Sequence, residues 1–196
     1  MFKVKSALTA FGVMMACAIA APLASAQSVI VVDTARVLRD SLGGQDLYSK
    51  VETIGQSMQA ELAPAQTALQ SERQTLDTQV AGMTREQVEA NPELVAQLQS
   101  YSRRLQTHMA STERRSRELQ QTETNALNIF AARMQEATET VRAARGADIV
   151  LAGVDVYLAS ETVNVTDEVI AQLNQTSPTI PVTRVVIDEN AEQAAQ

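Results

Sequence analysis

The chain is 196 residues long, 45% hydrophobic but only 3% aromatic, and carries a formal net charge of −7. This acidic balance repels phosphate and argues against nucleic acid as a partner. One cysteine, Cys17, and one histidine, His108, leave no basis for a disulfide framework, a Cys/His metal site or a nucleophilic triad. We therefore expect no metal and no cofactor, and we predict that the protein is not an enzyme.

The first 26 residues have the pattern of a secretory signal peptide. Two lysines precede an apolar stretch, 7–21, that is too short to span a bilayer, and Ala24-Ser25-Ala26 matches the A-x-A cleavage rule. We expect cleavage between Ala26 and Gln27, followed by export of residues 27–196. A lipoprotein acylated at Cys17 is the less favoured alternative, because the residues before it match a lipobox poorly.

Short apolar segments lie at both ends of the exported chain. The β-branched run 28–32 predicts a strand, and Asp33-Thr34 predicts the N-cap of a brief helix over 35–40. The Gly43-Gly44 pair then predicts a break in the chain.

Near the other end of the chain, residues 147–152 predict a second strand and 154–158 its hairpin partner. Thr166-Asp167-Glu168 predicts the cap of a short amphipathic helix. Residues 27–45 and 147–175 would together form a small β-body.

Between these segments, residues 46–146 predict a long antiparallel helical hairpin. Its tip falls near 81–92, where Thr84 and Gln87 resemble a capping box and Asn91-Pro92 resembles a second helix start. Pro64 predicts a bend in the first helix. Apolar residues at heptad spacing predict a coiled-coil seam, namely Leu62, Leu69, Leu76, Met83, Leu98, Leu105 and Leu119.

The fold class predicted from this layout is α+β, mostly α. Three short strands and one small helix bury too little apolar surface to fold alone. We therefore predict an obligate oligomer in which several copies share one β-core.

Charge is unevenly distributed along the chain. Residues 46–146 carry eleven basic and thirteen acidic side chains, a net of −2, whereas 147–196 carry one arginine against eight acids, a net of −7. Within the hairpin a basic stripe predicts either a solvated helix face or an attractor for acidic clients and anionic lipid head groups. It consists of Arg103, Arg104, Arg114, Arg115 and Arg117.

Residues 176–196 form an acidic C-terminal extension that opens with Pro178 and Pro181. Residues 182–187 predict either an edge strand or an extended tail. From Asp188 onward the composition predicts disorder.

Several of these segments resemble one known family. The strand at 29–33, the polar hairpin, and above all Ala147-Asp148-Ile149-Val150-Leu151 followed by 156–159 and 164–173 resemble the Skp (OmpH-like) periplasmic chaperones. The resemblance covers about residues 28–175. It implies a soluble periplasmic homotrimer, shaped like a jellyfish, whose arms hold unfolded outer-membrane proteins in transit without ATP.

The arms of this chain are nearly neutral, whereas arms in that family are strongly basic. Lipopolysaccharide-binding residues are therefore not transferred, and only the basic stripe remains a candidate for contact with anionic lipid or lipopolysaccharide. Candidate client-binding residues are the apolar side chains outside the seam, for which core packing is the alternative: Tyr101, Met109, Ile129, Phe130 and Met134.

A second hypothesis is that the hairpin is a structural spacer or adaptor of the cell envelope. A spacer requires a continuous seam of large apolar residues. Pro64 and the small, polar seam argue against this hypothesis.

Overall fold

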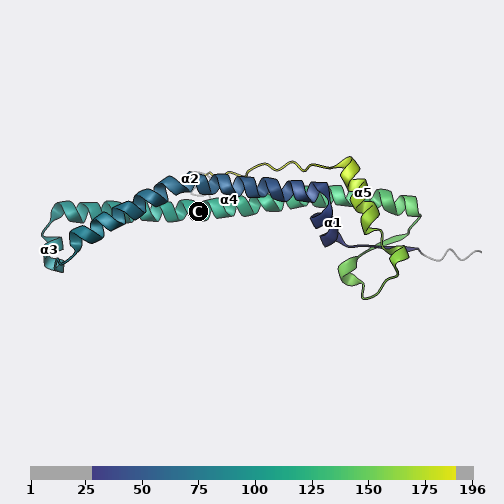
Figure 1. The fold of residues 1–196 in the computed structure, drawn as a ribbon, viewed down its shortest axis with the longest axis horizontal. Helices are drawn as coiled ribbons and strands as arrows, with labels where there is room; N and C mark the ends of the chain where they lie inside the picture. The colour runs from purple at the N-terminus through teal and green to yellow at the C-terminus, as the bar shows by residue number, and fades with distance from the viewer. Residues whose placement is uncertain (1–27, 189–196) are drawn as a thin grey trace, which may run out of the picture.

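The computed structural model describes residues 28–188 and has the shape of a long helical hairpin with a small body at one end (Figure 1). The predicted signal peptide, its cleavage site between Ala26 and Gln27, and the predicted disorder beyond Asp188 lie outside the described residues. No helix within residues 28–188 is long and apolar enough to cross a membrane.

The body contains a two-stranded parallel sheet built from both ends of the described chain. Strand β1 (Val29–Val32) pairs with β2 (Ile149–Ala152), with Val29 opposite Ile149 and Val32 opposite Ala152. The helices α1 (Thr34–Asp40) and α5 (Thr166–Thr176) pack beside the sheet (Figure 1). Asp33 caps α1 as predicted, since its carboxylate accepts a hydrogen bond from the Arg36 N–H at 2.9 Å.

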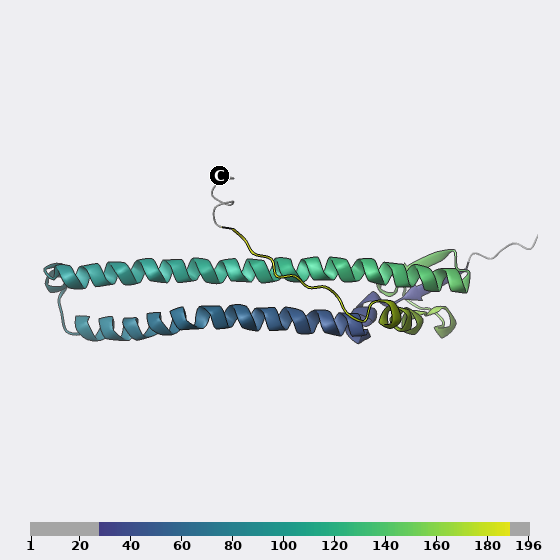
Figure 2. The ribbon, with the colours of Figure 1, turned by 90° about the horizontal axis from the view of Figure 1, so that it is seen from above.

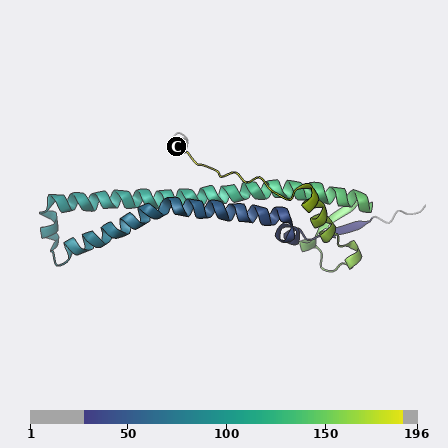
Figure 3. The ribbon, with the colours of Figure 1, turned by 45° about the horizontal axis from the view of Figure 1, so that its top comes forward.

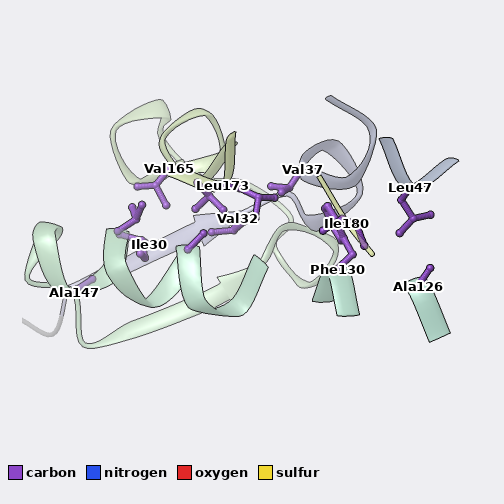
Figure 4. Packing of buried hydrophobic residues seen from close by; sticks show 13 residues of the cluster. Ile30, Val32, Val37, Leu47, Ala126, Phe130, Ala147, Val165, Leu173 and Ile180 are labelled. Carbon is purple, nitrogen blue, oxygen red and sulfur yellow. The ribbon is translucent and has the colours of Figure 1, made fainter. Parts of the chain in front are cut away.

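Buried side chains from β1, from α1 and α5, and from the base of the hairpin form one core, and Val150 of β2 packs against it (Figure 4). Val37, Leu47, Leu173 and Ile180 are completely buried. The core thus joins segments more than a hundred residues apart in sequence.

The predicted hairpin partner strand at 154–158 is wrong. Residues Gly153–Asp155 form a short 3-10 turn, and no residue from 154 to 158 pairs with a strand. The free side of β1 is occupied by later residues instead, because Val31 bridges Asn164 and accepts a hydrogen bond from the Val165 N–H at 3.0 Å.

The predicted break at Gly43-Gly44 is also wrong. Helix α2 begins at Leu42 and both glycines lie buried in its first turn. A Cβ atom at Gly43 would lie 2.7 Å from the Ser177 carbonyl oxygen, so glycine serves here for close approach rather than for a bend.

Thr166 does not cap α5 as predicted but is its first helical residue. Its hydroxyl instead accepts a hydrogen bond from the Asp33 N–H at 3.0 Å and so ties α5 to the end of β1. The acids after it pair across the body, Asp167 with Arg36 and Glu168 with Arg145.

The hairpin consists of α2 (Leu42–Val80) and α4 (Pro92–Arg145), joined through the short α3 (Arg85–Glu89). Its tip forms as predicted: Thr84 and Gln87 make a capping box, and Asn91 caps α4. Helix α4 ends at Arg145 and is capped by Gly146, whose φ of 63° is easily reached only without a side chain. Helix α2 continues through Pro64 and changes direction in its middle (Figure 3).

After α5 the chain runs back along the hairpin in an extended conformation (Figure 2). We call residues 177–188 the strap. Of the two conformations predicted for 182–187, the structure has the extended tail and not the edge strand. Figure 2 shows the strap passing over α4 about halfway along the hairpin.

Candidate functional site

The predicted seam residues differ in burial. Leu69 and Leu76 are buried, whereas the other five are only half-buried. Leu119 lies over Gly55, where an added Cβ would be 3.3 Å from a leucine methyl carbon. The two helices therefore approach each other through small residues as well as through large apolar ones.

The candidate client-binding residues also separate by exposure. Met109 is 63% exposed and Ile129 is 37% exposed, so both are available at the surface. Tyr101 is half-buried, and Met134 packs against the core. Phe130 is only 2% exposed and belongs to the core, so the core-packing alternative applies to it and it is not available as a client-binding residue.

The basic stripe does not form one solvated face. Arg104 pairs with Glu72 of α2, Arg115 with Glu61 and Glu118, and Arg117 with Glu113. Several of its charges therefore tie α4 to α2 or to neighbouring turns, and this reduces the positive field the hairpin presents to anions.

The strap is attached to both long helices through Arg184. Its guanidinium donates to both carboxylate oxygens of Glu61 on α2, at 2.6 and 3.0 Å, and lies 3.6 Å from the Glu118 carboxylate on α4. Such a two-bond contact fixes the orientation of the guanidinium as well as its position.

Backbone hydrogen bonds hold the strap on either side of Arg184. The Val185 N–H donates to the Thr122 hydroxyl at 2.9 Å, and the Ile187 N–H donates to the Glu118 carboxylate at 3.1 Å. Nearer the body, the Ile180 N–H donates to Asp46 at 2.8 Å, and its carbonyl accepts from Lys50 at 2.9 Å. The strap thus binds as an extended peptide.

Glu118 is completely buried beneath the strap. Burial raises the pKa of this carboxyl, but hydrogen bonds from Arg115 and from the Ile187 N–H outweigh burial and hold the pKa below its ordinary value of 4.5. The pKa of Glu61 is also lowered, chiefly by the Arg184 hydrogen bond. Both groups are therefore carboxylates at neutral pH.

A cavity of about 480 Å³ adjoins the strap on the side toward the tip. The cavity includes Glu61 and Arg115, which the strap also uses. Leu62, Ala65 and Leu69 line it from α2, and His108 lines it from α4 with a buried Nδ1 that finds no hydrogen-bond partner within residues 28–188.

The body exposes a group of large apolar side chains. Tyr157 is 97% exposed, Leu158 84% and Val154 82%, and Ile149 and Leu151 of β2 are each 40% exposed. A contiguous exposed apolar patch is a candidate surface for association with another protein. Within residues 28–188, no three His, Cys, Asp or Glu side chains are grouped to hold a metal ion.

Sequence reasoning did not identify Glu61, Glu118, Thr122 or Arg184 as a group. One signal was present, because Arg184 is the only basic residue among the last fifty. The i, i+4 spacing of Glu118 and Thr122 was a second signal, but no sequence rule relates either residue to a segment more than sixty positions away.

Comparisons with known proteins agree with this architecture. A crystal structure described as a candidate outer membrane chaperone (OmpH-like) from Caulobacter crescentus superposes with a TM-score of 0.72 at 24% identity. The alignment covers 83% of this chain and 92% of that chain, which shows a shared fold.

No curated protein is similar enough to count as a relative. The family model for outer membrane protein (OmpH-like) matches residues 28–173. This match ends before the strap begins. The chain therefore belongs to the OmpH-like family.

Proposed function

We propose that the protein is an ATP-independent holdase of the periplasm that binds unfolded outer-membrane proteins between helical arms and prevents their aggregation. The observation that carries this proposal is the form of the hairpin. Two long helices, α2 and α4, project far beyond a small body at one end (Figure 1). Membership of the OmpH-like family supports it.

The hairpin surface suits weak and distributed binding. Buried apolar side chains are sparse along the arm, and Met109 and Ile129 are exposed on α4. Flexible methionine side chains can re-pack against many different partners, so a surface that carries them binds with low specificity. A holdase needs such contacts, because it must release every client that it captures.

The proposed assembly is a homotrimer built through the body. A two-stranded sheet is marginal by itself, and β2 leaves half its side chains exposed. The exposed group at Val154, Tyr157 and Leu158 lies beside this sheet and supplies apolar surface for neighbouring copies. Three such bodies would place three hairpins around one cavity.

A structural spacer remains the second candidate function. It is supported by the length of the arm and by the ion pairs that join its helices, such as Arg104 with Glu72. The bend in the middle of α2 and the exposure of Pro64 argue against a rigid rod (Figure 3).

Light scattering separates the two functions. The purified exported protein is measured alone and then after mixing with an outer-membrane barrel protein diluted from urea. A mass of three chains, with the client kept soluble at a defined ratio, is the expected result. A monomer or an open-ended polymer that lets the client aggregate would favour the spacer.

A further inference from the structure

The distal part of the strap is held by few contacts. We call residues 183–188 the latch. Val186 is 69% exposed, and the latch is attached through Arg184 and through the N–H groups of Val185 and Ile187. By contrast Ile180, nearer the body, is completely buried in the core. The latch is therefore able to open while the rest of the strap stays in place.

The surface beneath the latch has the chemistry of a peptide site. Glu61 and Glu118 supply two carboxylates for one guanidinium, and Thr122 and Glu118 accept the N–H groups one and three residues later. These contacts recognise an arginine within an extended backbone. None of them requires the side chains of Val185, Val186 or Ile187 to have a particular shape.

The carboxylate of Glu118 offers free acceptor positions when the latch leaves. With the latch removed, Glu118 keeps Arg115 at 2.7 Å but exchanges Arg184 and the Ile187 N–H for water. Hydrogen bonds between a guanidinium and a carboxylate are stronger than those between neutral groups. A vacant latch site therefore favours an extended segment that supplies the same guanidinium and N–H donors.

The open cavity gives such a segment a place to begin binding. It shares Glu61 and Arg115 with the latch site and is lined on the α2 side by aliphatic side chains. A segment that binds there lies next to the Arg184 contacts before it displaces them.

We propose that the surface formed by Glu61, Glu118 and Thr122 is a binding site for extended, arginine-bearing segments of an unfolded client, and that the latch is its built-in competitor. This proposal rests on the proposed holdase function for the nature of the client. An unfolded barrel strand supplies an extended backbone, and arginine fits the polar positions of its alternating pattern.

Tethering sets the strength of the competition. The latch is joined to its own site by the chain, and a short tether gives an effective concentration in the millimolar range. A single weak segment does not displace it, whereas a long client that binds several arms at once does. Only clients with many extended segments would then displace the latch and reach the site.

The test uses the full chain with Arg184→Glu, which places a third carboxylate beside Glu61 and Glu118. Amide hydrogen exchange at Val185 and Ile187 reports whether the latch has opened. The probe is a fluorescent peptide with the sequence of residues 182–188, titrated by anisotropy. Arg73→Glu is the matched control, since Arg73 is exposed on the same helix as Glu61 but outside the site.

We expect the peptide to bind the Arg184→Glu chain about tenfold or more tightly than the unchanged chain or the control. Adding Glu118→Gln to the opened chain, or using a peptide with glutamate in place of its arginine, should abolish that gain. Equal binding to all chains, or no binding to an opened and folded chain, would overturn the proposal. If Arg184→Glu fails to fold, a second variant shortened after Thr183 removes the contacts of Arg184, Val185 and Ile187 without placing a glutamate side chain between Glu61 and Glu118.

Client capture separates this proposal from the holdase function. Tighter capture of the unfolded barrel protein by the opened chain supports a client site under the latch. Equal capture by the opened, unchanged and control chains refutes that site and leaves the holdase standing. Peptide binding without client capture by any chain refutes the holdase and the client assignment, but retains an arginine-specific peptide site.

Discussion

At the scale of single residues, the first turn of α2 depends on the absence of two side chains. A Cβ atom at Gly44 would lie 1.8 Å from the carbonyl oxygen of Leu38, which is far inside van der Waals contact. Ser41 is the N-cap of this helix, because its hydroxyl accepts a hydrogen bond from the Gly44 N–H at 3.1 Å. This tight turn lets α1 fold directly against the base of the hairpin.

We therefore expect Gly44→Ala to destabilise the protein by about 1 to 3 kcal/mol through overpacking. Gly55→Ala is the matched control in the same helix, since its nearest neighbour is the movable end of Leu119. Urea unfolding followed by circular dichroism measures both free energies of unfolding. Equal stability of the Gly44 variant and the unchanged chain would mean that α1 is not held against α2 in solution.

Glu118 stays ionised although it is buried between the hairpin and the strap. Its side chain is fully buried, yet two arginines and one backbone N–H lie around it. Removing a carboxylate from water costs several kcal/mol, and these partners offset that cost only when all are in place. The residue therefore couples α4 to the strap.

At the scale of elements, acid should release the strap. In the fold the pKa values of Glu61, Glu118 and Asp46 are all lowered, the first and last chiefly by hydrogen bonds from Arg184 and Lys50. A group with a lowered pKa stabilises the fold above its unfolded pKa and loses that contribution as the pH falls through the folded value. The strap should thus be docked at neutral pH.

We expect the hydrogen-exchange protection of Val185 and Ile187 to fall as the pH drops below about 4.5, the ordinary glutamate pKa. Protection factors at pH 7 and pH 3 measure the change. Amides near Val141, in the core part of α4, serve as the internal reference. Unchanged protection of the strap relative to that reference would show that its ion pairs contribute nothing to docking.

Pro64 is the second feature at this scale. Proline removes one backbone donor from the interior of α2 and bends it (Figure 3). We expect Pro64→Ala to restore a hydrogen bond, to raise stability by up to about 3 kcal/mol and to stiffen the arm. Under the proposed function, the stiffer arm should bind large clients more weakly than small ones.

A size series of unfolded barrel proteins tests this effect of Pro64 on client binding. Gln66 is also exposed and lies two residues after Pro64, so Gln66→Ala is the control for a substitution in this stretch of α2. If capture by Pro64→Ala matches that control for every client size, the bend has no part in binding.

At the scale of the whole molecule, the body should determine the assembly. For the proposed homotrimer, we expect Tyr157→Asp combined with Leu158→Asp to reduce the mass in solution from three chains to one. Both side chains are mostly exposed in the single chain, at 97% and 84%, so the substitutions should disturb its fold little. A charge buried between copies would destabilise the assembly by several kcal/mol.

Sedimentation velocity measures that mass, and Met109→Asp on the arm is the control for adding charge at an exposed apolar position. A trimer that survives the double substitution would place the interface elsewhere. A trimer lost in the control as well would show that the arms take part in assembly.

The sequence by itself determined the elements whose causes are local. Periodicity predicted the two long helices, the Thr84–Gln87 capping box and Asn91-Pro92 predicted the tip, and Asp33 predicted the start of α1. Each of these depends on side chains within about four positions of the backbone group they satisfy. The resemblance to the OmpH-like family likewise came from contiguous segments, and the family match confirms it.

Only the tertiary structure decided which distant segments meet. The missing strand at 154–158, the close packing of Gly43 against Ser177, and the burial of Phe130 each depend on contacts between residues far apart in sequence. The strap is the clearest case, since Arg184 meets Glu61 across 123 positions. Local propensity favours an extended chain at 182–187, whether as the edge of a sheet or lying along a helix. Only the carboxylates placed on α2 and α4 select the second arrangement.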